Sequence, residues 1–283
     1  MIERDDPERT ADALGAFETA ARGSRTVRDA LALSRQAARR REQGVFIAEG
    51  IHLAQEALRS EHPVRLALVS RKLLRHDEGR SVAASLIGKP FPVRRVEDAT
   101  LQTLASAESH QGILLVVERR RSSISDFLSG CRPAIVLVAC GIQDPGNLGA
   151  LARITEAAWG SGLACAGGAD PFSTRCVRAG AGSVFRLPLV EFPDITSAAA
   201  SLRGLGFRLI GASPQARQSY REERFDQDVA VFVGGEGAGL PSTARSILDA
   251  EVRIPIRAGV ESLNVASAAS VILFEAASRS RVD

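Results

Sequence analysis

The second half of the chain repeats one pattern, a short and continuous apolar run followed by a polar loop that often contains glycine. The runs are AIVLVAC, GLACAG, FRLPLVEF, GFRLIGAS, VAVFVGG and AEVRIPI, and helical segments separate most of them. Short runs without polar alternation are typical of strands buried on both faces, as in parallel sheets covered by helices. The sequence therefore predicts an α/β domain with a mostly parallel sheet over residues 134–283.

The first half predicts a smaller α/β domain. Strands and helices alternate from GVFIAEG to GILLVVE, which places this domain at residues 43–118. Residues 1–42 are predicted as a helical extension, loosely attached over its first 21 residues and rich in arginine after them. The polar segment RRRSSISDFLSGCRP, residues 119–133, is typical of a linker because it contains several serines and ends in proline.

Composition excludes several classes of protein. No apolar run approaches the ~18 to 20 residues of a membrane span, and the N-terminus MIERDDPERTADALG is charged where a signal peptide is apolar. We therefore expect a cytoplasmic protein without a membrane partner. The cysteines form no C-x-x-C pair, which favours reduced thiols over a disulfide framework. They are Cys131, Cys140, Cys165 and Cys176.

Charge and histidine content narrow the chemistry. The formal net charge is only +3, but arginines crowd residues 22–41 and 119–121. They form either a solvated helix face or a phosphate-binding surface, since guanidinium groups match phosphate oxygens. The four histidines all precede residue 111, so the second domain has no imidazole as base or ligand. We expect no metal site.

Three polar loops follow strands of the second domain, and ligands of open α/β sheets bind beyond the carboxyl ends of strands. The loops are CGIQDPGNLGALAR, VFVGGEGAGL and IPIRAGVESLNVASAASVILFEA. In the second loop, Leu240 stands where a phosphate-binding P-loop has lysine. Its glycine spacing also differs from the dinucleotide fingerprint, which disfavours a nicotinamide-dependent oxidoreductase.

The first loop leads into a predicted helix over residues 146–160, with Asn147 as its N-cap. An apolar stripe at helical spacing predicts its buried side. The stripe comprises Leu148, Leu151, Ala152, Thr155 and Trp159. Arg153 lies off this stripe. Taken alone, it could be a surface residue paired with Glu156, a contact of only ~0.2 to 0.5 kcal/mol.

The third loop leads into a second predicted helix, with Asn264 as its N-cap. Small and apolar residues form a narrow stripe along this helix. They are Val265, Ala268, Ala269, Ile272 and Ala276. The stripe permits close packing of another helix, which would be core packing within one chain or a dimer contact between two chains.

The three loops together resemble the motifs of the SpoU or TrmH-type RNA 2'-O-ribose methyltransferases of the SPOUT superfamily. The matching segments are DPGNLGALAR, VGGEGAGL and IPIRAGVESLNVASAA, with RAGAGSVFRLPL between the first and second. Two positions depart from the family pattern, where Gly235 replaces an asparagine and Gly180 a serine. The segment from GVFIAEG to SHQGILLVVE resembles the L30e-like RNA-binding domain often joined to these enzymes.

The resemblance implies a fold, a cofactor and a reaction. The C-terminal domain is expected to carry a deep trefoil knot and to work as a homodimer with active sites at the subunit contact. S-adenosylmethionine is expected to donate a methyl group to a ribose 2'-hydroxyl of RNA. The N-terminal domain favours 23S rRNA over tRNA. A non-catalytic RNA-binding or ribosome-assembly factor on the same fold is the alternative from another class.

The resemblance also assigns site residues. Cofactor binding falls to Gly234, Gly235, Gly237, Ile254 and Leu263. The catalytic set is Arg153, Asn147, Glu236, Ser262 and Asn264. Because a guanidinium stays protonated, we interpret Arg153 as a group that grips the phosphate beside the target ribose, not as the base. For Glu236, Ser262 and Asn264, capping and loop closure are competing roles. Arg178 and Arg186 are weaker candidates for phosphate contacts.

Overall fold

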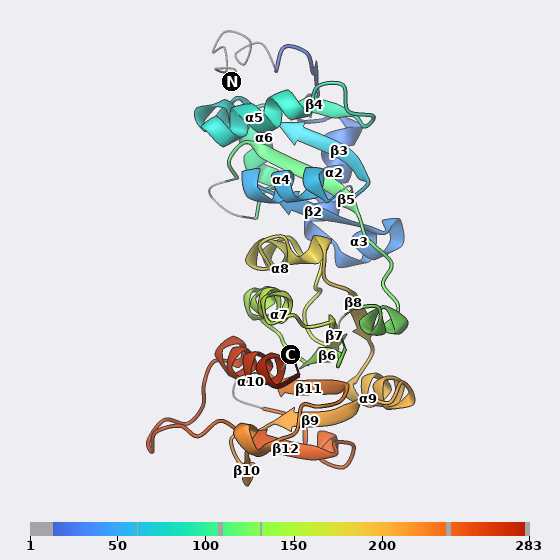
Figure 1. Cartoon of the computed structure of the whole chain (residues 1–283). Helices are drawn as coiled ribbons and strands as arrows, with labels where there is room; N and C mark the ends of the chain where they lie inside the picture. The colour runs from blue at the N-terminus through green and yellow to red at the C-terminus, as the bar shows by residue number, and fades with distance from the viewer. Residues whose placement is uncertain (1–13, 61, 107–109, 131, 236–238, 281–283) are drawn as a thin grey trace, which may run out of the picture. The chain divides into compact units, whose positions relative to one another are not determined.

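The computed structural model describes residues 14–60, 62–106, 110–130, 132–235 and 239–280, shown in Figure 1. The chain divides into two compact units. The first comprises the residues up to Arg120 together with Phe172–Arg178, and the second comprises Arg121–Pro171 and the residues from Ala179 onward. Both units combine a β-sheet with helices, so the predicted α/β class is confirmed.

Within the described residues, the first unit has a five-stranded sheet in which β5 runs antiparallel to both of its neighbours. The order across the sheet is β1 (Glu18–Thr19), β4 (Val93–Arg95), β3 (Val64–Val69), β5 (Ile113–Glu118) and β2 (Val45–Glu49). The helices and helical turns are α2 (Arg25–Arg35), α3 (Ala37–Gln43), α4 (Ile51–Arg59), η1 (Arg71–Arg75), α5 (Asp77–Ser85) and α6 (Asp98–Leu104).

Helix α2 belongs to the core of this unit, although sequence analysis assigned it to an extension. The hydroxyl of Ser24 caps its N-terminus by accepting a hydrogen bond from the Val27 amide at 3.4 Å. Val27, Ala30 and Leu33 then pack in one apolar cluster with α6 and the sheet. Residues 14–21 form a turn and β1, not the helix expected there, and residues 1–13 lie outside the described residues.

Buried polar groups close the strand ends of the first unit. The Glu49 carboxylate follows β2 and accepts hydrogen bonds from the backbone amide and the hydroxyl of Ser106, at 2.9 and 2.7 Å. The side-chain oxygen of Gln111 accepts from the Ile51 amide at the start of α4, at 3.1 Å. Nδ1 of His110, which is only 2% exposed, accepts from the Gly112 amide at 3.0 Å. These polar side chains satisfy the backbone where strands end.

The second unit has a seven-stranded sheet among the described residues, and all of its strand pairs are parallel. The order is β10 (Gln218–Ser219), β12 (Ala250–Arg253), β9 (Arg208–Ala212), β11 (Val229–Gly234), β6 (Ile135–Cys140), β7 (Gly162–Ala166) and β8 (Leu189–Phe192). The central strands β6 and β7 are buried along their whole length, as the continuous apolar runs predicted.

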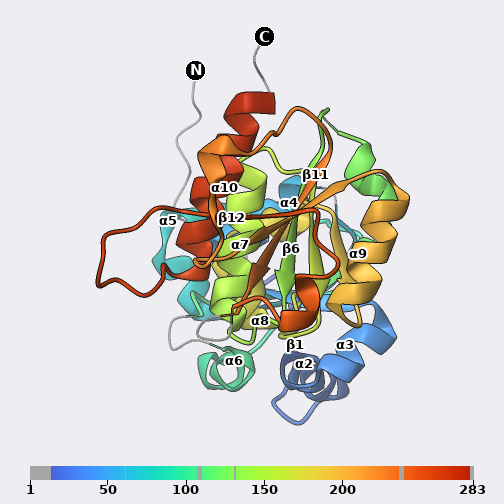
Figure 2. The same cartoon turned by 90° about the horizontal axis from the view of Figure 1, so that it is seen from below.

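Helices cover both faces of this sheet. Figure 2 shows α7 (Pro145–Ala157) and α10 (Val265–Ser280) on one side of β6 and β11, and α9 (Ile195–Gly204) on the other. The shorter helical segments described in this unit are η2 (Ile124–Leu128), η3 (Ser183–Phe185), η4 (Tyr220–Glu222) and η5 (Ser242–Ala244), whereas α8 (Thr174–Ala179) falls almost entirely in the first unit. Phe127 of η2 is fully buried in the core beside α9, so the segment predicted as a linker contributes a core residue.

The chain first extends the sheet from β6 through β7 to β8, and then returns to the other side of β6. There β11 lies between β9 and β6, and α10 returns from β12 to pack against α7. The trefoil knot stays a prediction of the resemblance. No helix within the described ranges is long and apolar enough to cross a membrane.

Candidate active site

The first loop joins β6 to α7, and its cap differs from the prediction. The carboxylate of Asp144 accepts a hydrogen bond from the Gly146 amide at 3.2 Å, and Pro145 occupies the first helical position. Asn147 therefore lies inside the first turn of α7 and is not its N-cap. Proline suits the first helical position because its missing amide hydrogen has no partner there anyway, so the helix begins before Asn147.

The buried side of α7 agrees with the predicted stripe except at its end. Leu148, Leu151, Ala152 and Thr155 are buried. Trp159 is 57% exposed and has a φ of 55°, because the chain has already left the helix. The amides of Trp159 and Gly160 bond back to the carbonyls of Glu156 and Thr155, which closes the helix in a left-handed cap.

Arg153 points away from the core, as predicted, and is exposed. Glu156 pairs with Arg186 and not with Arg153, with one of the two hydrogen bonds at 3.1 Å. Burial alone would raise the pKa of Glu156, but hydrogen bonds from Arg186 and Ser183 outweigh it and lower the pKa. Among the described residues, Arg153 has no ion pair, so its guanidinium is available to a ligand.

The second loop follows β11 and folds back on itself. The Gly239 amide donates to the Gly235 carbonyl at 3.0 Å, and the two residues form an antiparallel bridge. A Cβ atom on Gly234 would lie 2.0 Å from the Gly239 carbonyl oxygen, so only glycine fits there. A Cβ atom on Gly235 would meet the Gly141 oxygen at 3.6 Å, an ordinary contact. The predicted site residues Glu236 and Gly237 lie outside the described residues.

The third loop follows β12 and leads into α10. The side-chain oxygen of Asn264 accepts from the Ala266 amide at 2.9 Å, which confirms Asn264 as the N-cap. Its amide nitrogen donates to the side-chain oxygen of Asn147 at 3.2 Å. Two asparagines 117 positions apart thus join the first and third loops. Capping and bridging use different atoms of one side chain, so the two roles are compatible.

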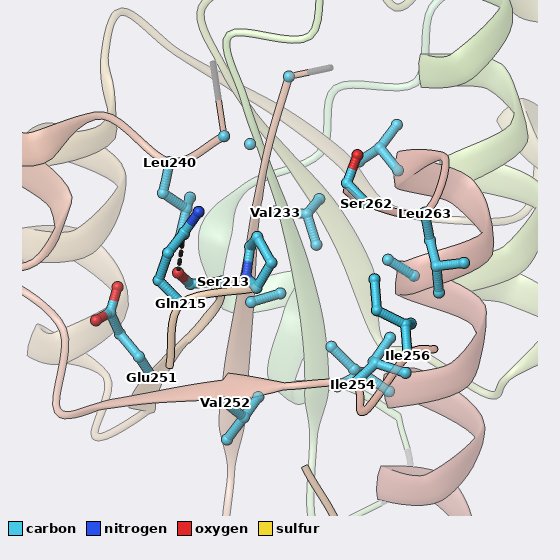
Figure 3. Close-up of a pocket in the computed structure, with 18 of the residues that line it drawn as sticks. Ser213, Gln215, Val233, Leu240, Glu251, Val252, Ile254, Ile256, Ser262 and Leu263 are labelled. Atoms are coloured by element: carbon cyan, nitrogen blue, oxygen red, sulfur yellow. Dashed lines mark hydrogen bonds between the residues drawn. The ribbon is translucent and has the colours of Figure 1, made fainter. Parts of the chain in front are cut away.

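A cavity of about 490 Å³ lies where the second and third loops meet the carboxyl ends of β9, β11 and β12 (Figure 3). Five predicted site residues line it, namely Gly234, Gly235, Ile254, Ser262 and Leu263. As far as the structure describes the chain, Asn147, Asn264 and Arg153 are not part of the lining. Within one chain, the cavity therefore gathers the described members of the predicted cofactor-binding set. Of the described members of the predicted catalytic set, it contains only Ser262.

Sequence reasoning missed a polar part of the cavity. Ser213 and Gln215, after β9, and Arg245 and Glu251, around η5 and β12, also line it. The available signal was the run GFRLIGAS, because a parallel strand next to β11 ends at the same edge of the sheet. Polar residues that follow this strand therefore reach the same cavity as the glycine-rich loop after β11.

Two further expectations concern the cysteines and metal binding. Cys140 ends β6, and burial raises the pKa of its thiol to about 12, so it is no nucleophile at neutral pH. Of the predicted reduced cysteines, Cys140, Cys165 and Cys176 are buried and form no disulfide among the described residues, and Cys131 lies outside the described residues. Within the described ranges, no group of His, Cys, Asp and Glu could hold a metal ion.

A parallel sheet with a cavity of this size at its carboxyl edge is typical of α/β proteins that bind small organic ligands. Comparison with known proteins specifies the class. Residues 134–274 match the SpoU rRNA methylase family, and residues 24–115 match the MRM3-like substrate-binding domain. The second match begins before α2, in agreement with the place of that helix in the core.

Relatives match over most of the chain. A tRNA/rRNA methyltransferase of Synechocystis, itself uncharacterized, is 30% identical, with 84% of this chain and 85% of the relative covered. The 23S rRNA (guanosine(2553)-2'-O)-methyltransferase RlmP of Bacillus subtilis is 28% identical, with 83% and 89% covered. The AdoMet-bound rRNA methyltransferase of Sinorhizobium meliloti superposes with a TM-score of 0.78 at 28% identity, covering 93% of this chain and 98% of the other.

The chain belongs to the SpoU rRNA methylase family and is an RNA methyltransferase. The resemblance inferred from the three loops is thereby confirmed. The roles of individual site residues stay predictions, which the geometry above allows us to sharpen.

Proposed function

We propose that the protein transfers a methyl group from S-adenosylmethionine to a ribose 2'-hydroxyl of RNA, with 23S rRNA as the favoured substrate. The observation that carries the proposal is the Asn147–Asn264 hydrogen bond, which ties the first loop to the third, while the second and third loops line the cavity. RlmP, which acts on 23S rRNA, supports the choice of substrate. Modification of ribosomal RNA implies a cytoplasmic enzyme.

The cavity fits the cofactor. Its volume of about 490 Å³ lies within the range of small-molecule sites, roughly 300 to 1,000 Å³. Ile254, Ile256 and Ile272 supply apolar surface for a flat adenosyl group, and Gly234 and Gly235 let the backbone approach closely. When bound, S-adenosylmethionine supplies a methyl group on a positively charged sulfur. The residues of the chain then have to orient the nucleotide and accept one proton.

The polar residues have different roles in this reaction. We assign to Arg153 the role of binding the phosphate beside the target ribose. Its guanidinium is exposed and has no ion pair among the described residues, so it can donate two parallel hydrogen bonds to that phosphate. Ser262, at the exposed rim of the cavity, is placed to contact the ribose. Asn147 and Asn264 hold the two loops in register. The proton passes to a phosphate oxygen or to water, because the second unit contains no histidine.

A methyl-transfer assay tests this function. Unmodified 23S rRNA and, separately, unmodified tRNA are incubated with radiolabelled S-adenosylmethionine and the protein, and the RNA is then hydrolysed with alkali. We expect label in an alkali-resistant 2'-O-methyl dinucleotide from 23S rRNA. Label in tRNA alone would show that tRNA is the substrate in place of 23S rRNA, and the proposed reaction would stand. Binding of both RNAs without any label would favour the non-catalytic assembly factor.

We further propose that the protein is a homodimer whose contact includes the outer face of α10. The predicted small-residue stripe is used within the chain, since Ala269, Ile272 and Ala276 are fully buried. The opposite face carries Phe274, which is 44% exposed, and the preceding loop carries exposed Val260 and Leu263. Exposed apolar groups of this kind favour association, and a second subunit would also supply a second Arg153 to complete the site.

The variant Phe274→Glu tests the dimer. Burial of a phenylalanine contributes about 1.5 to 3 kcal/mol, so we expect the dimer dissociation constant to rise at least about tenfold. Sedimentation velocity over a range of concentrations measures it. Ile87→Glu is the matched control, because Ile87 is a comparably exposed apolar residue, at 52%, in the first unit. A wild-type protein that sediments as a monomer would overturn this proposal.

A further inference from the structure

Helix α7 carries a carboxylate one turn after its candidate catalytic arginine. Arg153 and Glu156 are three positions apart, and residues at this spacing are neighbours on the surface of a helix. Opposite charges at such positions attract each other, so Glu156 is a potential competitor for the guanidinium that we assign to an RNA phosphate. The structure nevertheless leaves Arg153 exposed and without an ion pair among the described residues.

Glu156 is bound instead by the helical turn η3. Nε and Nη2 of Arg186 donate to the two carboxylate oxygens of Glu156, the second at 3.1 Å. The hydroxyl of Ser183, a residue that is only 1% exposed, donates to the same carboxylate. Side chains three residues apart lie on the same side of a 3₁₀ turn, which explains why Ser183 and Arg186 reach one acceptor.

These contacts make Glu156 a poor partner for Arg153. Both oxygens of its carboxylate already accept hydrogen bonds, and paired hydrogen bonds from one guanidinium are the strongest that a carboxylate receives from a side chain. The positive charge of Arg186 also offsets a negative charge that would otherwise repel an RNA phosphate at Arg153. Arg186 therefore opposes both ways in which Glu156 could weaken the phosphate contact.

We propose that Arg186 and Ser183 are positioning residues that hold Glu156 away from Arg153 and so keep the Arg153 guanidinium available to the RNA phosphate. Arg186 then acts through Glu156, and not through a phosphate of its own as the sequence allowed. It follows that Glu156 harms RNA binding once Arg186 is removed. This inference rests on the proposed function.

Steady-state methylation of unmodified 23S rRNA by single and double variants tests the inference. In Arg186→Gln the released carboxylate attracts Arg153 and repels the phosphate, so we expect the KM for 23S rRNA to rise about three- to fivefold. The kcat should change less than about twofold, because saturating RNA displaces the carboxylate. Glu156→Gln combined with Arg186→Gln should return the KM to within about twofold of the wild-type value.

Arg203→Gln is the matched control, because it breaks an ion pair of similar exposure on α9, on the other side of the sheet from α7 (Figure 2). The side chains of Arg203 and Asp249 are 51% and 28% exposed, against 46% for Arg186 and 28% for Glu156. We expect this control to keep the KM of the wild type. Calorimetry should find the same affinity for S-adenosylmethionine in all of these variants.

An unchanged KM in Arg186→Gln would overturn the inference. A double variant that stays as weak as Arg186→Gln would also overturn it, because Arg186 would then contact RNA itself or only support α7. A wild-type protein that transfers no methyl group to RNA would instead overturn the proposed function, so the two failures are distinguishable.

Discussion

The strand ends of the two units use polar residues in opposite ways. In the first unit, Glu49, His110 and Gln111 are bonded to nearby backbone amides, and the first two are buried. In the second unit, Gln215 follows β9 at the carboxyl edge and Arg153 lies within α7, and both are exposed with donors that no described residue uses. Both sets follow or precede strands in the sequence. The difference teaches that polar character at a strand end becomes a site where the fold leaves hydrogen-bonding groups accessible; Oε1 of Glu49 also lacks a hydrogen bond from any described residue, but it is buried.

Parallel topology accounts for this difference. All strands of the second sheet end at one edge, so the loops after β9, β11 and β12 meet there and their side chains surround one cavity. In the first sheet, β5 is antiparallel to β3 and β2, so the end of β2 lies beside the start of β5, and the polar residues there bond to nearby backbone amides.

Arg153→Ala should have the largest effect, and on function alone. Loss of the phosphate contact misplaces the hydroxyl, so we expect methyl transfer to fall at least about 100-fold. The unfolding free energy should change by less than about 0.5 kcal/mol, as for an exposed residue without an ion pair. Single-turnover methylation and urea denaturation measure the two quantities. Arg217→Ala, at another exposed arginine of the second unit, is the control. Full activity of Arg153→Ala would refute the assignment.

Gly234→Ala should have an intermediate effect. The added Cβ would lie 2.0 Å from the Gly239 oxygen, so the second loop must move. Overpacking of this kind costs about 1 to 3 kcal/mol, and we expect S-adenosylmethionine to bind roughly 5- to 100-fold more weakly. Gly204→Ala, at the end of α9, is the control, since its Cβ would meet nothing within 4 Å and Gly204 does not line the cavity. If calorimetry finds equal losses for both variants, the clash at Gly234 is not the cause.

Protonation of His110 should have the smallest effect, and it should change the stability of the fold alone. Burial lowers the pKa of His110 below the ordinary value of 6.5, and nearby Lys72 acts in the same direction against Asp98 and Glu49. The unfolded chain then binds the proton more readily, so the contribution to stability is present above about pH 6.5 and is lost as the pH falls toward the lower folded pKa. Protonation of Nδ1 would also break its bond with the Gly112 amide.

Urea denaturation near pH 7.5 and pH 5.5 measures this effect, and we expect the unfolding free energy to be lower at pH 5.5, by no more than about 1.4 kcal/mol for a single group. His110→Gln should remove this part of the pH dependence, and His76→Gln, at an exposed histidine, should leave it unchanged. A pH dependence that survives in His110→Gln would assign it to other groups.

The sequence predicted the elements of the second unit well because each strand carries its own local signal. The apolar runs mark β6, β7, β9 and β11, and the three loops carry specific motifs. It failed where the deciding interaction is tertiary. Asp144 replaced Asn147 as the cap, Trp159 left the buried stripe, and the two-residue strands β1 and β10 were missed because pairing partners far along the chain define them.

By itself, the sequence determined the α/β class, the strand ends where ligands bind, and the family, since periodicity and motifs are local properties of the chain. The tertiary structure decided which polar residues remain available. It joined Asn147 to Asn264 across 117 positions, enclosed Glu49 and His110, and brought Gln215, Arg245 and Glu251 to the cavity. The physical reason is that burial and hydrogen-bond partners depend on which segments meet in space, and no local pattern specifies that meeting.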